Sequence, residues 1–326
     1  MAGASLRSGT GTSATRLQRV AAHVVAAAAA AAAASKLLPP RVEQLRHEVQ
    51  AARQPPPHHT SRLEELLAAR LALSRLQDAE QHAAAVTQEA ASIRELQLER
   101  FAVELDTRGW TVVPPTITGL TPQRVEALRR AIYRVAEERQ QQVGGDPAPE
   151  SMQRCYMVLF EDRVFEEALM NPAMRCLISF LLGDDAVLSS SIATIKRQGH
   201  APFVMHADGP TEDRSQPLGA TAMFCLSDFQ GEVGGATAFV PFSHRIGAGP
   251  WRDELTDPAA VGAEAVNAPA GSLLVWSEAT WHGAFPRLEP EGERVDLLFY
   301  HVLSSMLTEE TYRETVRIDE MTLDNY

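Results

Sequence analysis

The fold is decided by Ala186-Val-Leu-Ser-Ser-Ser-Ile-Ala-Thr-Ile-Lys196, the longest of five short apolar or alternating runs in the second half of the chain. The other four runs cover residues 220–226, 237–241, 272–276 and 295–303. Gly, Pro and Asp residues separate them, as turn residues separate strands. Short strands in series without intervening helices are typical of a barrel or sandwich. The second half therefore predicts a mostly β domain.

Helical patterns dominate the first half of the chain. Ser61 and Glu64 form an S-x-x-E capping box ahead of a Leu/Ala/Glu/Arg stretch that reaches about Leu105 without Gly or Pro. We interpret residues 42–105 as a helical arm packed on the domain behind it, because its leucines do not sustain the a/d heptad of a coiled coil. A dimerising coiled coil is the alternative, and it would make the arm an oligomerisation element.

Two further helices are expected before the β runs. Thr121 and Pro122 open the first, whose apolar residues share one face. Asn171 and Pro172 cap the second, which ends at a glycine. We therefore expect one domain over residues 106–305, with a β core braced by helices.

Composition and charge exclude several classes of protein. Of 326 residues, 45% are hydrophobic and 22% are charged, which is globular composition and rules out wholesale disorder. Lys and Arg number 30 against 42 for Asp and Glu, and the net charge of −12 argues against a nucleic-acid partner. The 3 cysteines have no C-x-x-C spacing, so neither a disulfide framework nor a thiolate zinc site is indicated. A small-molecule substrate in a reducing, intracellular compartment fits best.

The two ends of the chain differ in charge from the middle. Residues 1–42 carry Lys and Arg but no acidic residue, which resembles an organellar transit peptide. We interpret residues 1–41 as a targeting or disordered leader with a mitochondrial or plastid address; a secretory signal and unaddressed low complexity in a cytoplasmic protein are the alternatives. The apolar run 20–34 is too short and alanine-rich for a membrane span, so no stable membrane insertion is expected. Residues 306–326 form an acidic tail.

His206-Ala-Asp208 and the distant His282 form the most informative chemical pattern. Residues two apart on an extended segment point to the same side, so this imidazole and carboxylate can take neighbouring positions on a metal. A histidine from a facing strand completes two histidines and one carboxylate, the ligand set of non-haem Fe(II) oxygenases. His244 and His200 are rival ligands by residue type, and we interpret them as structural or as supports of the ligands.

Two further segments give this pattern its context. Residues 234–244 read Gly-Gly-Ala-Thr-Ala-Phe-Val-Pro-Phe-Ser-His, and residues 270–276 read Ala-Gly-Ser-Leu-Leu-Val-Trp ahead of Trp-His-Gly at 281–283. Following the H-x-D motif and preceding Arg294, they resemble the phytanoyl-CoA dioxygenase family of Fe(II)- and 2-oxoglutarate-dependent oxygenases. The resemblance spans residues 104–302 and implies a double-stranded β-helix, a jelly roll of the cupin kind, preceded by an α-helical region.

The resemblance implies a role for each residue of the site. His206, Asp208 and His282 would be the iron ligands, and Arg294 would hold the distal carboxylate of 2-oxoglutarate. A planar guanidinium can meet a carboxylate with two parallel hydrogen bonds, which an ammonium cannot. Lys196, ahead of the first histidine, is a further candidate for contact with substrate or co-substrate.

The chain departs from the family pattern at two positions. Ala284 stands where the family often has a hydroxyl residue, so Arg294 is expected to work with some other donor. Phe242 replaces the glycine of P-G-S-H, which indicates a different turn before Ser243. Arg287 is the rival to Arg294, but the proline before it favours a loop, whereas Arg294 heads a predicted strand.

The reaction that the resemblance implies is hydroxylation of a small organic substrate with Fe(II), 2-oxoglutarate and O2, releasing succinate and CO2. Related halogenases lack the carboxylate ligand, so Asp208 favours hydroxylation over halogenation. Two other functions stay open. One is a cupin-like sensor that binds a metal or small molecule without catalysis, and the other is an interaction protein whose essential part is the helical arm.

Overall fold

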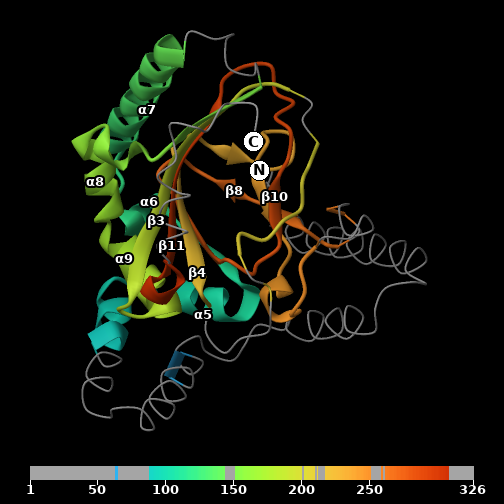
Figure 1. The fold of residues 1–326 in the computed structure, drawn as a ribbon. Coiled ribbons are helices and arrows are strands. Elements are labelled where there is room, and N and C mark those ends of the chain that lie inside the picture. Colours follow the sequence, from blue (N-terminus) through green and yellow to red (C-terminus); the bar gives the residue numbers. More distant parts are fainter. Residues whose placement is uncertain are drawn as a thin grey trace, which may run out of the picture. The chain divides into compact units, whose positions relative to one another are not determined.

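The computed structural model describes residues 63–64, 88–143, 151–199, 202–209, 211, 217–250, 258–259 and 261–307, which belong to one compact unit (Figure 1). The expected leader, most of the helical arm, His200 and the tail beyond residue 307 lie outside the described residues. Within the part of the chain that the structure describes, no helix has both the length and the apolar character needed to cross a bilayer.

A six-stranded sheet forms the larger wall of the β core, in the order β1-β9-β4-β11-β3-β2. Every neighbouring pair is antiparallel, and most neighbours are distant in sequence, so the chain crosses over repeatedly as it builds this wall. Its strands are β1 (Trp110–Val113), β2 (Met152–Tyr156), β3 (Ala186–Lys196), β4 (Gly219–Cys225), β9 (Leu273–Ser277) and β11 (Arg294–Leu303).

A smaller three-stranded sheet, in the order β10-β6-β7, and one strand pair complete the β core. These strands are β6 (Thr237–Phe239), β7 (Glu264–Ala265) and β10 (His282–Ala284), with β5 (Phe229–Gln230) paired to β8 (Asn267–Ala268). The five runs predicted from the sequence all form strands, at nearly the predicted bounds. The expected double-stranded β-helix with helical support is confirmed.

Helices cover the outer face of the large sheet, as α7, α8 and α9 show beside β3 and β11 in Figure 1. The two predicted helices are α7 (Pro122–Val143) and α9 (Pro172–Leu182). Asn171 caps α9 as expected, because its Oδ1 accepts a hydrogen bond from the Met174 N–H. The other helices are α5 (Glu99–Arg108), α6 (Pro115–Thr118) and α8 (Arg163–Leu169).

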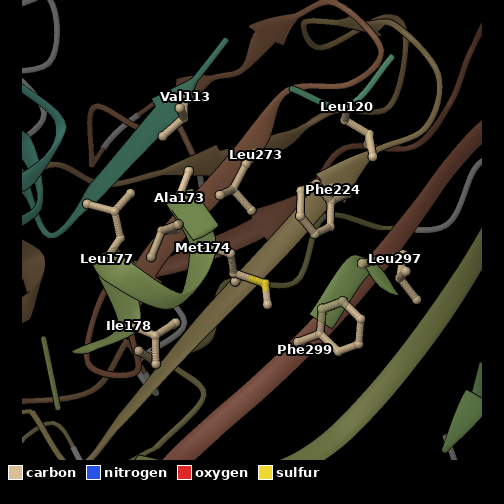
Figure 2. Close-up of a cluster of buried hydrophobic side chains, with 14 of the residues drawn as sticks. Val113, Leu120, Ala173, Met174, Leu177, Ile178, Phe224, Leu273, Leu297 and Phe299 are labelled. Atoms are coloured by element: carbon tan, nitrogen blue, oxygen red, sulfur yellow. The ribbon is translucent and has the colours of Figure 1, made fainter. Parts of the chain in front are cut away.

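The main hydrophobic core lies between these helices and the sheet (Figure 2). Met174 and Leu177 of α9 belong to the same buried cluster as Phe224 of β4 and Phe299 of β11, and all four are fully buried. Full burial of side chains of this size contributes about 1.5–3 kcal/mol each. This packing fixes the outer face of the sheet and leaves its inner face for the site.

The predicted helical arm is interrupted before the β domain. Residues 88–95 are helical, but the chain turns at Gln97, which adopts a left-handed backbone with φ 57°, before α5 begins. The turn lets Leu98 be fully buried together with Ile93, and the Leu98 N–H still donates to the Ile93 carbonyl. The expectation of an unbroken helix to Leu105 is therefore wrong here, because tertiary burial outweighs local helix propensity.

Alternate residues of the large sheet face the interior of the β core, away from the helices. On β11, Leu297 and Phe299 belong to the helix-side core, whereas Asp296 and Leu298 lie on the opposite face. The inner face carries a second apolar cluster, made of Trp110, Met223, Cys225, Phe229, Ala236, Phe239, Val266, Ala268, Leu274 and Trp276. Polar residues on this face therefore lie in largely apolar surroundings.

Candidate metal centre

The structure brings His206, Asp208 and His282 together at one end of the β core. One ligand atom from each residue lies within 4.8 Å of the other two. Nε2 of His282 is 3.4 Å from Oδ1 of Asp208, and Nε2 of His206 is 3.7 Å from the same oxygen. The backbone positions the two histidines directly, because each N–H donates to the carbonyl of the other at 2.8 Å. His282 opens β10, and His206 extends the small sheet beside it.

Both imidazoles are oriented by a backbone carbonyl two residues earlier. Nδ1 of His282 lies 2.9 Å from the Thr280 oxygen, and Nδ1 of His206 lies 3.1 Å from the Val204 oxygen. Donation from Nδ1 fixes the tautomer in which Nε2 carries a lone pair. Each histidine therefore directs a potential ligand atom toward Asp208.

Asp208 is held by two side chains that the sequence analysis missed. Its Oδ2 accepts a hydrogen bond from Thr221 Oγ1 at 2.7 Å and one from Trp276 Nε1 at 2.8 Å. Thr221 of β4 and Trp276 of β9 are direct partners on neighbouring strands. Both side chains therefore reach the Asp208 carboxylate from the inner face of the large sheet. Oδ1 is left to face the histidines.

The charge state of these residues suits a cation. Burial disfavours the Asp208 carboxylate, but neighbouring His282 and the Thr221 hydrogen bond outweigh that effect and hold the pKa of Asp208 well below its usual range. Burial and the charge of His282 lower the pKa of His206, which favours the neutral imidazole that binds metals. Burial also acts to lower the pKa of His282, but Asp208 raises it overall.

A third missed residue, Glu278, connects the segment of Asp208 to the start of β4. Its backbone carbonyl accepts the Asp208 N–H at 2.9 Å, and its carboxylate accepts the Leu218 N–H at 2.7 Å. Burial raises the pKa of Glu278. Hydrogen bonds from the Leu218 backbone, the Ser277 side chain and the Gly219 backbone lower it, but by less. Glu278 thus supports the backbone that presents Asp208.

Among the described residues, the three ligands differ in exposure. The His282 side chain is 6% exposed and the Asp208 side chain 22%, whereas that of His206 is 43% exposed. The ring of Trp276 lies 5.1 Å from that of His282, and Phe239 lies 5.7 Å from it. Aromatic rings therefore cover His282, and within the described part of the chain the centre is most exposed at His206.

Lys196 and Arg294 face each other across β3 and β11 on the same inner face. Both side chains are buried together with Asp296. Arg294 donates to Asp296 Oδ2 at 2.7 Å and to the Gly235 carbonyl at 2.7 Å, while Lys196 Nζ donates to the Phe285 carbonyl. With Lys196 protonated, these two cations beside one carboxylate form a buried cluster with a net positive charge.

This cluster retains unused hydrogen-bond capacity. Arg294 Nε is buried and has no hydrogen-bond partner among the described residues. Burial, with the charge of Arg294 next in importance, lowers the pKa of Lys196 to about 7. Arg287, the rival arginine, also has a buried Nε without a partner among the described residues, but its other nitrogens donate to the Gly234 and Glu291 carbonyls, and it pairs with Glu289 at 3.0 Å. It connects two surface turns and does not join the cluster.

The segment before the distal histidine explains the role of the Ser-His pair at 243–244. Ser243 Oγ accepts the Trp281 N–H at 2.7 Å and donates to the Val240 carbonyl, which fixes the approach to β10. His244 Nε2 lies 3.2 Å from the Asp106 carbonyl, away from the group of metal-ligating atoms. Phe242 adopts φ 67°, the left-handed backbone that glycine favours, so the turn uses this conformation without a glycine.

Fold and site together define a class of protein. A double-stranded β-helix in which two imidazoles and one carboxylate converge is the architecture of a non-haem metal enzyme. The chain belongs to the phytanoyl-CoA dioxygenase (PhyH) family, whose model matches residues 105–290, more than half of its length. The family resemblance found in the sequence is confirmed. The chain is therefore an enzyme of the Fe(II)- and 2-oxoglutarate-dependent oxygenase class.

Individual relatives are distant. Dioxygenase af480 of Aspergillus fumigatus is 26% identical over 214 residues, which are 63% of this chain and 67% of that protein. Among solved structures, apo EctD from S. alaskensis superposes with a TM-score of 0.53 at 19% identity, covering 65% of this chain and 79% of EctD. HygX from Streptomyces hygroscopicus, with nickel and 2-oxoglutarate bound, gives 0.51 at 20% identity, covering 63% and 86%. These structural likenesses support the fold.

Proposed function

We propose that this chain is a hydroxylase that couples conversion of 2-oxoglutarate to succinate and CO2 with insertion of one oxygen atom from O2 into a C–H bond of a small organic substrate. Asp208 favours hydroxylation over halogenation, because it supplies a third protein ligand beside the two histidines. The HygX structure supports the choice of co-substrate, since that distant relative holds nickel and 2-oxoglutarate.

The residues present fit an Fe(II) ion. His206 and His282 would each supply Nε2, and Asp208 would supply Oδ1, because their other polar atoms already have hydrogen-bond partners in the protein. This convergence of three uncommitted ligand atoms is the observation that carries the proposal. Iron and 2-oxoglutarate, when bound, supply the activation of O2 and the oxidation of the substrate.

The buried cluster of Lys196 and Arg294 fits the distal carboxylate of 2-oxoglutarate. Arg294 Nε lacks a partner, and Lys196 has three N–H donors of which the Phe285 carbonyl accepts one. Lys196 thus supplies the donor that Ala284 lacks. When Lys196 is protonated, two cations and the Asp296 carboxylate leave one positive charge, which one further carboxylate balances.

The surrounding side chains keep this chemistry dry. Trp276 and Phe239 cover His282 from inside the barrel, and the apolar cluster of the inner face continues behind them. Exclusion of water strengthens the charge interactions of Lys196 and Arg294 with an anion. The substrate would approach past His206, on the exposed side.

The proposal is tested by measuring succinate formation and the incorporation of oxygen into a product. The full chain is reconstituted anaerobically with Fe(II), mixed with 2-oxoglutarate and a library of small metabolites, and exposed to O2 labelled with the heavy isotope. We expect iron-dependent succinate and a product that carries one labelled oxygen. Binding of metal and 2-oxoglutarate without succinate would favour the sensor, and product without oxygen gain would favour another oxidation by the same site.

A further inference from the structure

Arg294 and Lys196 both occupy the ends of their strands, where the chain leaves the large sheet. Arg294 is the first residue of β11 and Lys196 the last of β3, and the two are partners in the register. Strand ends fray at lower cost than strand interiors. A guanidinium that must meet a carboxylate in a fixed geometry therefore needs support from outside these two strands.

Glu293 and Arg197 provide a contact on the opposite face of the sheet. Arg197 follows the last residue of β3, and Glu293 precedes the first residue of β11. Their side chains point toward the helices, as those of Ile195 and Val295 two residues away do. Nε of Arg197 is 2.7 Å from Oε1 of Glu293. This ion pair joins the two strand ends directly behind the buried cluster.

Helix α7 holds the other oxygen of the Glu293 carboxylate. The Tyr133 hydroxyl donates to Oε2 of Glu293, and Arg129, one helical turn earlier, donates to the Tyr133 oxygen at 3.3 Å. Burial, followed by the hydrogen bond to Glu293, raises the pKa of Tyr133 to about 12, so the phenol stays a donor at neutral pH. Tyr133 also packs against the main hydrophobic core. Glu293 is thus fixed between a strand end and the inner side of a long helix.

The same helix also fixes the start of β11 from the side of β4. Arg129 donates to the carbonyl of Leu226, the residue after β4, at 3.2 Å. The Leu226 N–H in turn donates to the Val295 carbonyl at 2.9 Å, and the Val295 N–H donates to Ser227 Oγ at 3.0 Å. Residues 293–295 are therefore held on both sides by contacts that lead back to α7.

We propose that Glu293 and Tyr133 are positioning residues for 2-oxoglutarate, which act through the start of β11 to hold Arg294 at the distance and angle that the distal carboxylate requires. The inference rests on the proposed function, which assigns this carboxylate to the buried cluster. Both residues act from the helix-facing side of the sheet, so neither contacts the co-substrate. A loss of affinity confined to the distal carboxylate is what distinguishes positioning from a general contribution to stability.

The experiment compares two 2-oxo acids that differ at one end only. 2-Oxopentanoate keeps the 2-oxo acid group and the chain length of 2-oxoglutarate, but it ends in a methyl group in place of the distal carboxylate. The Kd of each acid is measured by calorimetric titration of the Ni(II)-loaded full chain, which reports binding without turnover. The Ni(II) affinity and the Tm of the metal-free chain are measured for every variant.

Glu293→Gln keeps the shape of the side chain and removes the ion pair. It should raise the Kd of 2-oxoglutarate about 3- to 10-fold, the range for coupling between neighbouring groups, and leave the Kd of 2-oxopentanoate and the Ni(II) affinity unchanged. Tyr133→Phe removes one hydroxyl and should raise the Kd of 2-oxoglutarate about 2- to 5-fold. The double variant should resemble Glu293→Gln alone, because both changes act through the same carboxylate.

Glu161→Gln is the matched control. Glu161 also pairs with an arginine of α7, since Nη2 of Arg139 lies 2.6 Å from its Oε1, but this pair joins the helix to the turn before α8 and not to β11. The control should lower the Tm, as the test variants do, and bind both 2-oxo acids as the wild type does.

Three results would overturn the positioning role: an unchanged Kd of 2-oxoglutarate in the test variants, an equal loss of affinity for both 2-oxo acids, or an equal loss in the control. If Glu293→Gln does not fold, Tyr133→Phe is judged by the same criteria. Failure of the proposed function gives a different pattern, in which the wild-type chain binds 2-oxoglutarate no more tightly than 2-oxopentanoate. The assignment of the distal carboxylate to the buried cluster then fails first, and the positioning role fails with it.

Discussion

Thr221→Val tests whether the hydrogen bonds behind Asp208 prepare it for a metal. The Thr221 hydroxyl is buried, lies 2.7 Å from Asp208 Oδ2 and donates to it. Valine has nearly the same shape, so the change removes the donor and keeps the packing against Trp276 across the sheet. The carboxylate then keeps only the Trp276 Nε1 hydrogen bond, at 2.8 Å.

The size of the effect follows from this geometry. A hydrogen bond to a charged acceptor contributes about 1.5–3 kcal/mol, and we take the lower end because Trp276 continues to hold the same oxygen. We expect the metal-free protein to lose about 1.5 kcal/mol of folding free energy. Loss of a group that orients a ligand weakens metal binding about 10- to 100-fold, and with one of two donors left we expect about 10-fold.

The assay is an anaerobic Fe(II) titration against a competing chromogenic chelator, with a thermal melt of the metal-free protein. Thr111→Val is the matched control, because Thr111 is equally buried and donates to Glu104, remote from the metal ligands. The control should lose stability and retain metal affinity. Equal metal affinity in wild type and Thr221→Val, or an equal loss in both variants, would refute the orienting role of Thr221.

The other predictions concern the ligands and the buried cluster. His206→Ala and His282→Ala should each abolish Fe(II) retention in a desalting assay and lower succinate formation at least about 100-fold, since each removes one of three protein ligands; retained turnover in either variant would show that the ligand set is different. Arg294→Lys should raise the KM for 2-oxoglutarate roughly 5- to 50-fold and leave Fe(II) affinity unchanged, because charge is kept and the two-pronged fork is lost. Arg287→Lys is its control, and a reversed result would exchange their roles. With a pKa of about 7, Lys196 is protonated below that pH and neutral above it, so the KM for 2-oxoglutarate should rise as pH increases through about 7. Lys196→Arg should flatten this rise, and an equally steep profile in that variant would assign the titration to another group.

The strands and the metal ligands were predictable because each leaves a local mark in the sequence. A strand buried on both faces reads as a continuous apolar run, and β11 is such a run with one internal acid, Asp296. The ligands leave an H-x-D motif and a Trp-His-Gly segment. In contrast, β10 is only three residues long and β2 carries Gln153 and Arg154, so neither shows a strand pattern on its own.

The residues that support the ligands could not be identified from the sequence, because their role depends on which face of a strand lies inside the β core. In 220–226 nearly every residue is apolar, so alternation does not reveal that Thr221 faces Asp208. The pairing of β4 with β9 determines which way Thr221 faces, since the register places Trp276 beside Thr221. One signal was available: a single hydroxyl in an apolar strand is a group that needs a partner.

The net charge of the chain and that of the buried cluster of Lys196, Arg294 and Asp296 have opposite signs when Lys196 is protonated, and the difference matters for how 2-oxoglutarate binds. A net charge of −12 opposes the approach of an anion at long range, and salt weakens this repulsion. Inside the β core, contacts are shorter than the Debye length of about 8 Å at physiological ionic strength, so Arg294 and Lys196 act on a bound carboxylate with little screening. For 2-oxoglutarate, moderate salt should therefore speed association, while Arg294→Lys mainly speeds dissociation. A neutral ligand would show neither dependence, because both effects act on the charge of the ligand.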